Sequence, residues 1–280
     1  MQRKSLFCFP GVSLGLRFHA CLHQEESFTF IVRKLWKRAF QLYQAHLFTT
    51  FATLSLFFGV FLLWRTENFL EMHNVGLFFT QPFLAFISTL SFGHQLGYNN
   101  ILPLYIVLMF FASFVLYLSC KRQGLLLLLS FTLYVICGFY KIAPPSYPIQ
   151  GKWFLNPLSW QFLFILGLTS TLFLKQGRKI TIQPVLVVFS AGYLLLSLLW
   201  VRFKWWGVLG WLHWSSPLID FNKTFLSLPR LLHIIALSSL FLCLPRLYNL
   251  FHVSEQNPLA ILGRHSLPVF VTGTIFAMFG

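Results

Sequence analysis

Residues 101–120 read ILPLYIVLMFFASFVLYLSC and residues 124–140 read GLLLLLSFTLYVICGFY, with only Lys121, Arg122 and Gln123 between them. The hydrocarbon core of a bilayer is about 30 Å thick, and roughly 20 residues of α-helix cross it. A helix also satisfies its own backbone hydrogen bonds in lipid. These uncharged windows therefore predict two transmembrane helices joined by a short cationic connection.

Similar windows recur along the chain. They cover residues 46–64, 158–174, 182–200 and 225–244, and a last one begins at Ser266 and reaches the end of the sequence. Residues 82–92 are apolar but only about half a span long, which fits a re-entrant, interfacial or short tilted helix. We therefore expect an all-α, polytopic transmembrane bundle of about six to eight spans.

The composition agrees with lipid as the main solvent. Hydrophobic residues make up 57% of the chain and charged residues 10%, and the mean hydropathy is +0.71. A soluble domain carries roughly a quarter charged residues. The net charge of +15 would suggest nucleic acid as a partner of a soluble protein, but here the basic residues stand at span ends and form no single patch. We expect the lipid bilayer as a partner, and no nucleic acid.

No catalytic or metal-binding motif in the sequence assigns a function to the chain. The five cysteines form no CxxC pair and do not group with histidines, so the sequence predicts neither a metal site nor a disulfide. It also contains no P-loop, GxSxG elbow, HExxH motif or internal repeat.

Lys and Arg fall unequally on the two sides of these spans, fourteen on one side and seven on the other. The positive-inside rule places the richer side, which includes the N-terminal segment, in the cytoplasm. Residues 28–44 predict an amphipathic helix. We therefore expect residues 1–45 to be a cytoplasmic or interfacial segment and residues 46–280 a single multi-span domain. Pro10 and Gly11 interrupt the apolar run after Lys4, which argues against a cleaved signal peptide.

Burying a polar residue in the membrane costs free energy. Each group of such residues in this sequence therefore has a functional and a structural interpretation. Arg33 and Arg38 come before His46, at the entry to the first span. The arginines suit a phosphate-bearing donor, because guanidinium binds phosphate with two parallel hydrogen bonds. Anchoring to lipid headgroups is the alternative, and periodicity alone favours it.

A second polar group lies on the opposite side of the membrane and precedes the next span: His94, Gln95, Tyr98, Asn99 and Asn100. The group could bind the hydroxyls of a sugar-like acceptor, or His94 could act as a general base. A simply solvated histidine at the end of a span is the alternative. Asn156 stands before Pro157 as a helix N-cap. Trp160 and Gln161 follow it and either line a cavity or anchor the interface.

Five segments carry a family resemblance: RAFQLYQAHL (38–47), NILPLYIVL (100–108), YPIQGKWFLNPLSWQ (147–161), KTFLSLPRLLH (223–233) and LGRHSLPVF (262–270). They resemble the OpgC family of bacterial inner-membrane proteins, which succinylate osmoregulated periplasmic glucans and are similar in fold to the acyltransferase-3 group. The resemblance implies an O-succinyltransferase with no permanently bound cofactor and with succinyl-CoA, a cytoplasmic acyl-CoA, as co-substrate.

The resemblance also implies roles for residues already singled out. Arg33 and Arg38 would bind the acyl-CoA, and His94 or His46 would be the catalytic base. The glucan acceptor would be held by Gln95, Asn156, Trp160, Gln161 and His233.

The chain departs from the family pattern at both ends. Family members begin with a further span or two that carry an acidic residue, an Arg-Gly pair and a His proposed as proton acceptor, and nothing comparable precedes Arg33. Relatives tend to carry an acid where this chain has Asn100. We therefore expect a truncated member, in which loss of the base would leave a binding scaffold. A permease-like or structural membrane protein that handles a lipid or glycan without chemistry is the alternative.

Overall fold

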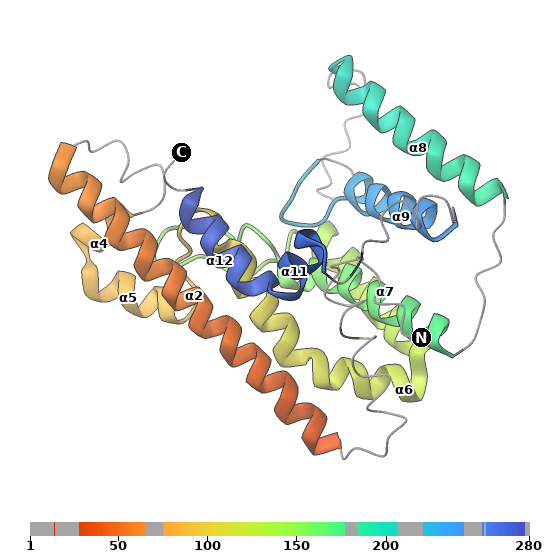
Figure 1. The fold of residues 1–280 in the computed structure, drawn as a ribbon, viewed down its shortest axis with the longest axis horizontal. Coiled ribbons are helices and arrows are strands. Elements are labelled where there is room, and N and C mark those ends of the chain that lie inside the picture. The colour runs from red at the N-terminus through yellow and green to blue at the C-terminus, as the bar shows by residue number, and fades with distance from the viewer. Residues whose placement is uncertain are drawn as a thin grey trace.

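The computed structural model describes residues 28–64, 75–176, 184–205, 221–243 and 256–277, together with Leu14 and Ser254. Within these ranges every regular element is a helix, and the extended pairing is limited to one isolated bridge between Pro145 and Lys152. Figure 1 shows the helices gathered along α2, α6 and α7. The predicted all-α architecture is confirmed.

The elements follow one another along the chain as α2 (Phe28–Trp64), α4 (Gly76–Thr80), α5 (Pro82–Leu90), η1 (Gly97–Asn100), α6 (Ile101–Phe139), α7 (Pro157–Lys175), α8 (Pro184–Arg202), α9 (Leu228–Cys243), α11 (Pro258–Arg264) and α12 (Ser266–Phe276). Proline stands in the first turn of α5, α7 and α11, where its missing N–H leaves no intrahelical bond unmade.

Five of the described helical segments are long and apolar enough to cross a membrane: Phe28–Leu63, Ile101–Ser119, Lys121–Phe139, Pro157–Leu174 and Pro184–Arg202. Helices α11 and α12 add a sixth if they act as one span, although they are bent by 96°. The apolar run of α9 is shorter than a full span. The chain is thus a multi-pass membrane protein, with five or six spans in the part that the structure describes.

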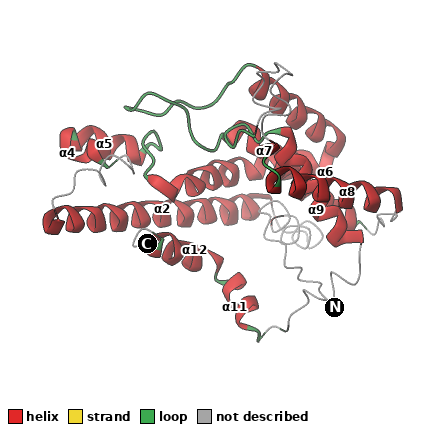
Figure 2. Ribbon diagram, turned by 90° about the horizontal axis from the view of Figure 1, so that it is seen from above, coloured by secondary structure: helices red, strands yellow, loops and turns green. Residues whose placement is uncertain are grey.

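Helix α2 joins two segments that the sequence pattern separates. The amphipathic residues 28–44 and the apolar residues 46–64 form one helix of 37 residues, about 55 Å long. Figure 2 shows it straight along its length. The first half is also part of the bundle, since Ile31, Leu35 and Leu42 are buried in the largest core cluster. No helix break therefore marks the predicted boundary between residues 45 and 46, and the position of residues 1–45 relative to the membrane stays a prediction.

Helix α6 is a hairpin of two spans. Arg122 has non-helical dihedrals (φ −147°, ψ 71°) and separates the halves, as the cationic connection predicts. The first half runs antiparallel to α2, with Trp36 stacked on Phe110 at 5.4 Å and Phe28 in an edge contact with Tyr117 at 5.7 Å between ring centroids. The Arg122 turn therefore lies near the N-terminal end of α2.

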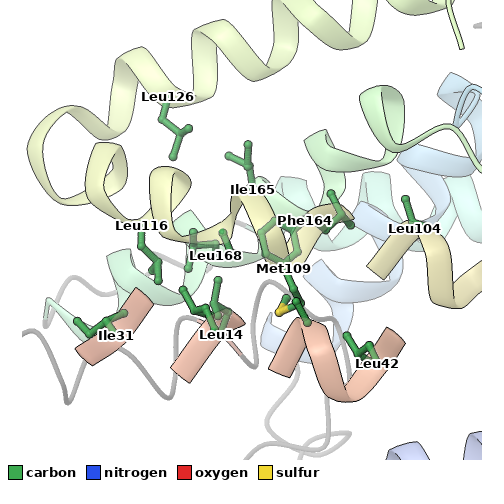
Figure 3. Packing of buried hydrophobic residues seen from close by; sticks show 14 of the residues in the cluster. Leu14, Ile31, Leu42, Leu104, Met109, Leu116, Leu126, Phe164, Ile165 and Leu168 are labelled. Carbon is green, nitrogen blue, oxygen red and sulfur yellow. The ribbon is translucent and has the colours of Figure 1, made fainter. Parts of the chain in front are cut away.

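The core lies where α2, α6 and α7 meet. Figure 3 shows Ile31 and Leu42 of α2 beneath Leu116 and Met109 of α6, with Leu168 of α7 in the same cluster. Leu267 and Phe270 of α12 pack against this cluster from the C-terminal part of the chain. The pair α8 and α9 lies at the periphery in Figure 1, and Ser190 is the one buried residue of α8.

Three loops meet at the other end of α6. The Tyr147 N–H donates to the Gly93 carbonyl at 3.0 Å, and the Asn156 N–H donates to the Thr224 carbonyl at 3.1 Å. Gly93 suits this close approach, because a Cβ atom here would lie only 3.2 Å from the Tyr147 carbonyl oxygen. The structure thus brings together three loops that the distribution of Lys and Arg places on the same side of the membrane. Which side faces the cytoplasm stays a prediction.

Candidate functional site

A polar stripe runs along the second half of α2. His46, Thr50 and Thr53 are spaced i, i+4 and i+7, so they share one face of the helix. They are 0%, 2% and 1% exposed. Phe57 continues the stripe and packs with Leu96 in a small apolar cluster. Polar residues thus occupy buried positions of a helix whose length and composition suit a membrane span.

The segment after α5 covers this stripe. Phe92 has a positive φ of 64°, and its ring centroid lies 5.5 Å from that of His46. Helix η1, which carries the fully buried Asn99, packs directly on α2. Leu96 packs with Phe57, and α6 packs back along α2 toward Trp36. Asn99 therefore lies buried in the short helix that packs on α2.

Six buried polar atoms on α2 and η1 have no hydrogen-bond partner in the described part of the chain. They are both ring nitrogens of His46, the hydroxyl oxygens of Thr50 and Thr53, and the side-chain oxygen and nitrogen of Asn99. The Thr89 backbone lies near the imidazole, but neither ring nitrogen makes a contact with hydrogen-bond geometry. A buried polar group without a partner costs about 1–3 kcal/mol. A group of four such residues is therefore a strong candidate for a functional site.

Neighbouring polar residues behave differently. The Thr49 hydroxyl donates to the carbonyls of Ala45 and His46, at 2.9 Å and 3.0 Å. The Thr89 hydroxyl donates to the Ala85 carbonyl at 2.8 Å. Such bonds to the helix's own backbone are the usual way for a hydroxyl to be satisfied in an apolar span. Thr50 and Thr53 do not use it.

Acidic residues do not contribute to this site within the described ranges, which contain no Asp or Glu. The described residues therefore offer no carboxylate base and no carboxylate to orient an imidazole. They also contain no group of three His, Cys, Asp or Glu side chains that could hold a metal ion. The basic group at the site is the imidazole of His46.

His94 is buried, at 3% exposure, so its interpretation as a solvated histidine at a span end is wrong. Its backbone N–H donates to the Ser88 carbonyl at 3.0 Å, and its ring lies 5.6 Å from that of Phe78. The Gln95 side chain donates to the Phe92 carbonyl at 3.1 Å. Both residues therefore help to build the turn that covers the stripe, and their predicted roles in catalysis and acceptor binding stay predictions.

Arg33 and Arg38 lie nearer the N-terminal end of α2 than His46 does. Arg38 is eight residues before His46, or about 12 Å along the axis and roughly 80° around it. Arg33 is about 20 Å away and roughly 140° around the helix. Arg38 is half-buried as a residue, and its guanidinium donates to the Gln41 side chain at 3.4 Å in an exposed position. Of the two predicted donor-binding residues, Arg38 is thus the better placed toward His46.

Asn156, Trp160 and Gln161 use their polar groups within the fold. Asn156 accepts from the Leu158 N–H at 3.1 Å, which confirms the predicted N-cap. The Trp160 indole donates to the Lys223 carbonyl at 3.1 Å. The Gln161 side chain accepts from the Ser130 hydroxyl at 2.7 Å and donates to its carbonyl at 2.9 Å. These bonds hold α6, α7 and the loop before α9 together, and a role in substrate binding stays a prediction.

His233 lies on the α8–α9 pair, where its Nδ1 is 3.2 Å from the Ser197 hydroxyl. Figures 1 and 2 place this pair at the opposite end of the molecule from α4 and α5, which flank the second half of α2. The structure thus brings His46 together with the segment that carries His94 and Gln95, but not with His233.

Asn99 belongs to the polar group predicted before the next span, whereas Thr50 and Thr53 were not among the predicted site residues. The signal that points to them is their spacing, since Thr50 and Thr53 repeat the helical period of His46 in an otherwise apolar window.

Comparison with known proteins gives one match. A family model described as OpgC protein matches residues 6–280. No curated protein and no solved structure matches the chain.

Proposed function

Because this chain belongs to the OpgC protein family, we propose that it is a membrane O-acyltransferase that transfers a succinyl group from a cytoplasmic acyl-CoA to a hydroxyl of a periplasmic glucan. The observation that carries the proposal beyond the family match is the imidazole of His46, buried and unpartnered within the described structure. It stands beside other unpartnered polar groups and has no acidic residue near it among those described. Such a group is suited to take a proton from a substrate that enters the site.

The reaction needs one base and balances without a metal. The acceptor hydroxyl gives its proton to a neutral ring nitrogen of His46 while its oxygen attacks the thioester carbonyl carbon. The tetrahedral intermediate then expels the coenzyme A thiolate, and the imidazolium gives the proton that it took from the acceptor hydroxyl to this leaving thiolate. The products are a glucan succinyl ester and free coenzyme A.

The donor would reach this point along α2. Arg38 is about two turns before His46, and a guanidinium suits the phosphates of coenzyme A. We place the N-terminal segment in the cytoplasm and the loops around Gly93 and Tyr147 in the periplasm of a bacterial inner membrane. This placement follows from the distribution of Lys and Arg.

The test uses the full chain reconstituted in lipid vesicles with radiolabelled succinyl-CoA and a neutral glucan. We expect label in the glucan as an alkali-labile ester. His46→Gln should lower transfer by at least about a hundredfold, as expected for loss of a general base. His265→Gln is the matched control, because His265 is exposed and its side chain does not cap α12.

Glucan movement across the vesicle membrane without ester formation would reject the acyltransferase and favour the permease-like alternative. Transfer that is unchanged in His46→Gln would keep the enzyme but reject His46 as its base.

A further inference from the structure

The unpartnered atoms beside His46 have a defined chemical character. The hydroxyls of Thr50 and Thr53 each donate and accept, and the Asn99 carboxamide offers two N–H groups and one carbonyl oxygen. All three side chains are uncharged, and all lie at 2% exposure or less. A ligand that satisfies them must therefore also both donate and accept hydrogen bonds.

Among the residues that the structure describes, the charged side chains nearest to Thr50 and Thr53 lie several helical turns away or donate to backbone carbonyls. On α2 the cation nearest to the stripe is Arg38, about 18 Å before Thr50 along the axis. In the loop beyond Phe92, Lys152 is exposed and donates to the Lys141 carbonyl. No Asp or Glu occurs among the described residues. Phosphate and carboxylate groups offer only acceptors and need cationic partners when buried, so they do not suit this place.

A pair of neighbouring sugar hydroxyls fits these requirements. Each hydroxyl donates one hydrogen bond and accepts up to two. Adjacent ring hydroxyls can bind side chains on α2 and η1 together, since η1 packs directly on α2. Thr50 is one helical turn from His46, about 6 Å along the axis. One hydroxyl held at Thr50 therefore leaves its neighbour close to the imidazole.

We propose that Thr50, Thr53 and Asn99 form a subsite for two adjacent uncharged hydroxyls of one sugar unit, and that they present one of these hydroxyls to His46. This inference rests on the proposed acyltransferase function and assigns its acceptor specificity. Thr50, Thr53 and Asn99 are positioning residues, because they hold the acceptor while the proton moves to His46.

Succinylation changes the charge of the sugar unit. A succinylated sugar unit carries a carboxylate, and this subsite has no cation to receive it among the described residues. The unit that has reacted is then a poor ligand, and so is any unit that carries another anionic group. We expect the enzyme to acylate a given sugar unit once and to move on to unmodified units.

The first experiment measures direct binding of a neutral glucose oligomer to the full chain in lipid nanodiscs by calorimetry. Thr50→Val and Thr53→Val preserve side-chain shape and remove one hydroxyl each. Each should weaken binding about two- to tenfold, the range expected for loss of one hydrogen bond. Asn99→Leu should weaken it at least as much.

Thr49→Val is the matched control. Thr49 is a buried threonine on the same helix, but its hydroxyl is satisfied by the carbonyls of Ala45 and His46. The affinity of the Thr49→Val protein for the oligomer should stay within twofold of that of the parent protein. In a transfer assay, the Thr50 and Thr53 variants should raise the KM for glucan and leave the KM for succinyl-CoA unchanged. Valine variants at positions 49, 50 and 53 that all bind alike would overturn the subsite.

The second experiment compares the neutral oligomer with the same oligomer oxidised to carboxylates at its primary hydroxyls. We expect at least a tenfold loss of affinity, and equal binding would overturn the proposal. Binding is measured without succinyl-CoA, so the result tests the sugar subsite independently of the acyltransferase function. Oligomer binding that depends on Thr50, in a protein that transfers no succinyl group, would reject the enzyme and keep the subsite.

Discussion

The ring of Phe92 lies over the imidazole of His46, with the two centroids 5.5 Å apart and the planes inclined by 52°. The same Phe92 ring makes an edge contact with Trp153 at 6.2 Å. The segment between α5 and η1 therefore separates His46 from the loop at residues 144–156. A deeply buried imidazole depends on this cover to keep bulk water away.

Phe92→Ala should admit water to the site. We expect slower transfer to glucan together with faster hydrolysis of succinyl-CoA to free succinate, because water then competes with the sugar hydroxyl. Chromatography of the labelled products gives the ratio of ester to succinate. A ratio equal to that of the parent protein would mean that Phe92 does not exclude water.

His46→Leu should separate stability from activity. It removes two unpartnered buried nitrogen atoms, so the free energy of unfolding should stay unchanged or rise by about 1–2 kcal/mol. Transfer activity should be lost. Thermal unfolding in detergent, followed by intrinsic fluorescence, measures the first effect. A strongly destabilised His46→Leu protein would indicate that the imidazole has a structural partner.

Arg38→Ala should raise the KM for succinyl-CoA more than Arg33→Ala does. Arg33 is exposed and lies on the far side of α2 from His46, whereas Arg38 is half-buried and closer. An ion pair with a phosphate at an accessible site contributes about 1 kcal/mol or somewhat more, which corresponds to roughly a five- to tenfold change. Equal effects from the two variants would point to general attraction of the anionic donor.

Tyr134→Phe tests the docking of the loop before α9. The Tyr134 hydroxyl donates to the Leu226 carbonyl at 2.8 Å, and both residues are buried. Loss of this bond leaves the carbonyl without its partner, so unfolding should become easier by about 1–3 kcal/mol. Tyr140→Phe is the control, because Tyr140 is 70% exposed. Transfer kinetics should change little in either variant.

Sidedness can be tested with one cysteine at a time, in place of Lys121 or of Lys152, in a protein whose five native cysteines are replaced by serine. Both side chains are exposed. They lie at opposite ends of the α6 hairpin, one beside the Arg122 turn and the other in the loop after α6. A membrane-impermeant thiol reagent added to intact cells with permeable outer membranes should label position 152 and spare position 121. The reverse pattern would invert the proposed donor and acceptor sides.

The sequence could predict the helices because hydrophobicity and length determine them. Residues 101–120 and 124–140 became the two halves of α6, and the Lys-Arg connection became its turn. The N-cap at Asn156 was predictable from the proline after it. Burial of the first half of α2 within the bundle was not predictable, because a cationic face looks the same on a surface helix as on one whose other face is buried against α6.

The site was harder to predict, because it depends on which polar atoms find partners. Thr49, Thr50 and Thr53 are identical in a hydropathy profile, yet Thr49 bonds to its own helix and the other two do not. Burial of His94 likewise depends on the turn that folds over α2, with Phe78 beside the ring. Those contacts come from segments more than 15 residues away along the sequence.

The straight, unbroken course of α2 fixes the distances between the functional residues that it carries. Arg38, His46 and Thr50 lie on one continuous helix, so the rise per residue sets the axial distances between them. One extra residue between Arg38 and His46 would turn Arg38 by roughly 100° relative to the sugar end of the site. Coordination of the two substrates would then depend on helical phase, with no hinge to correct it.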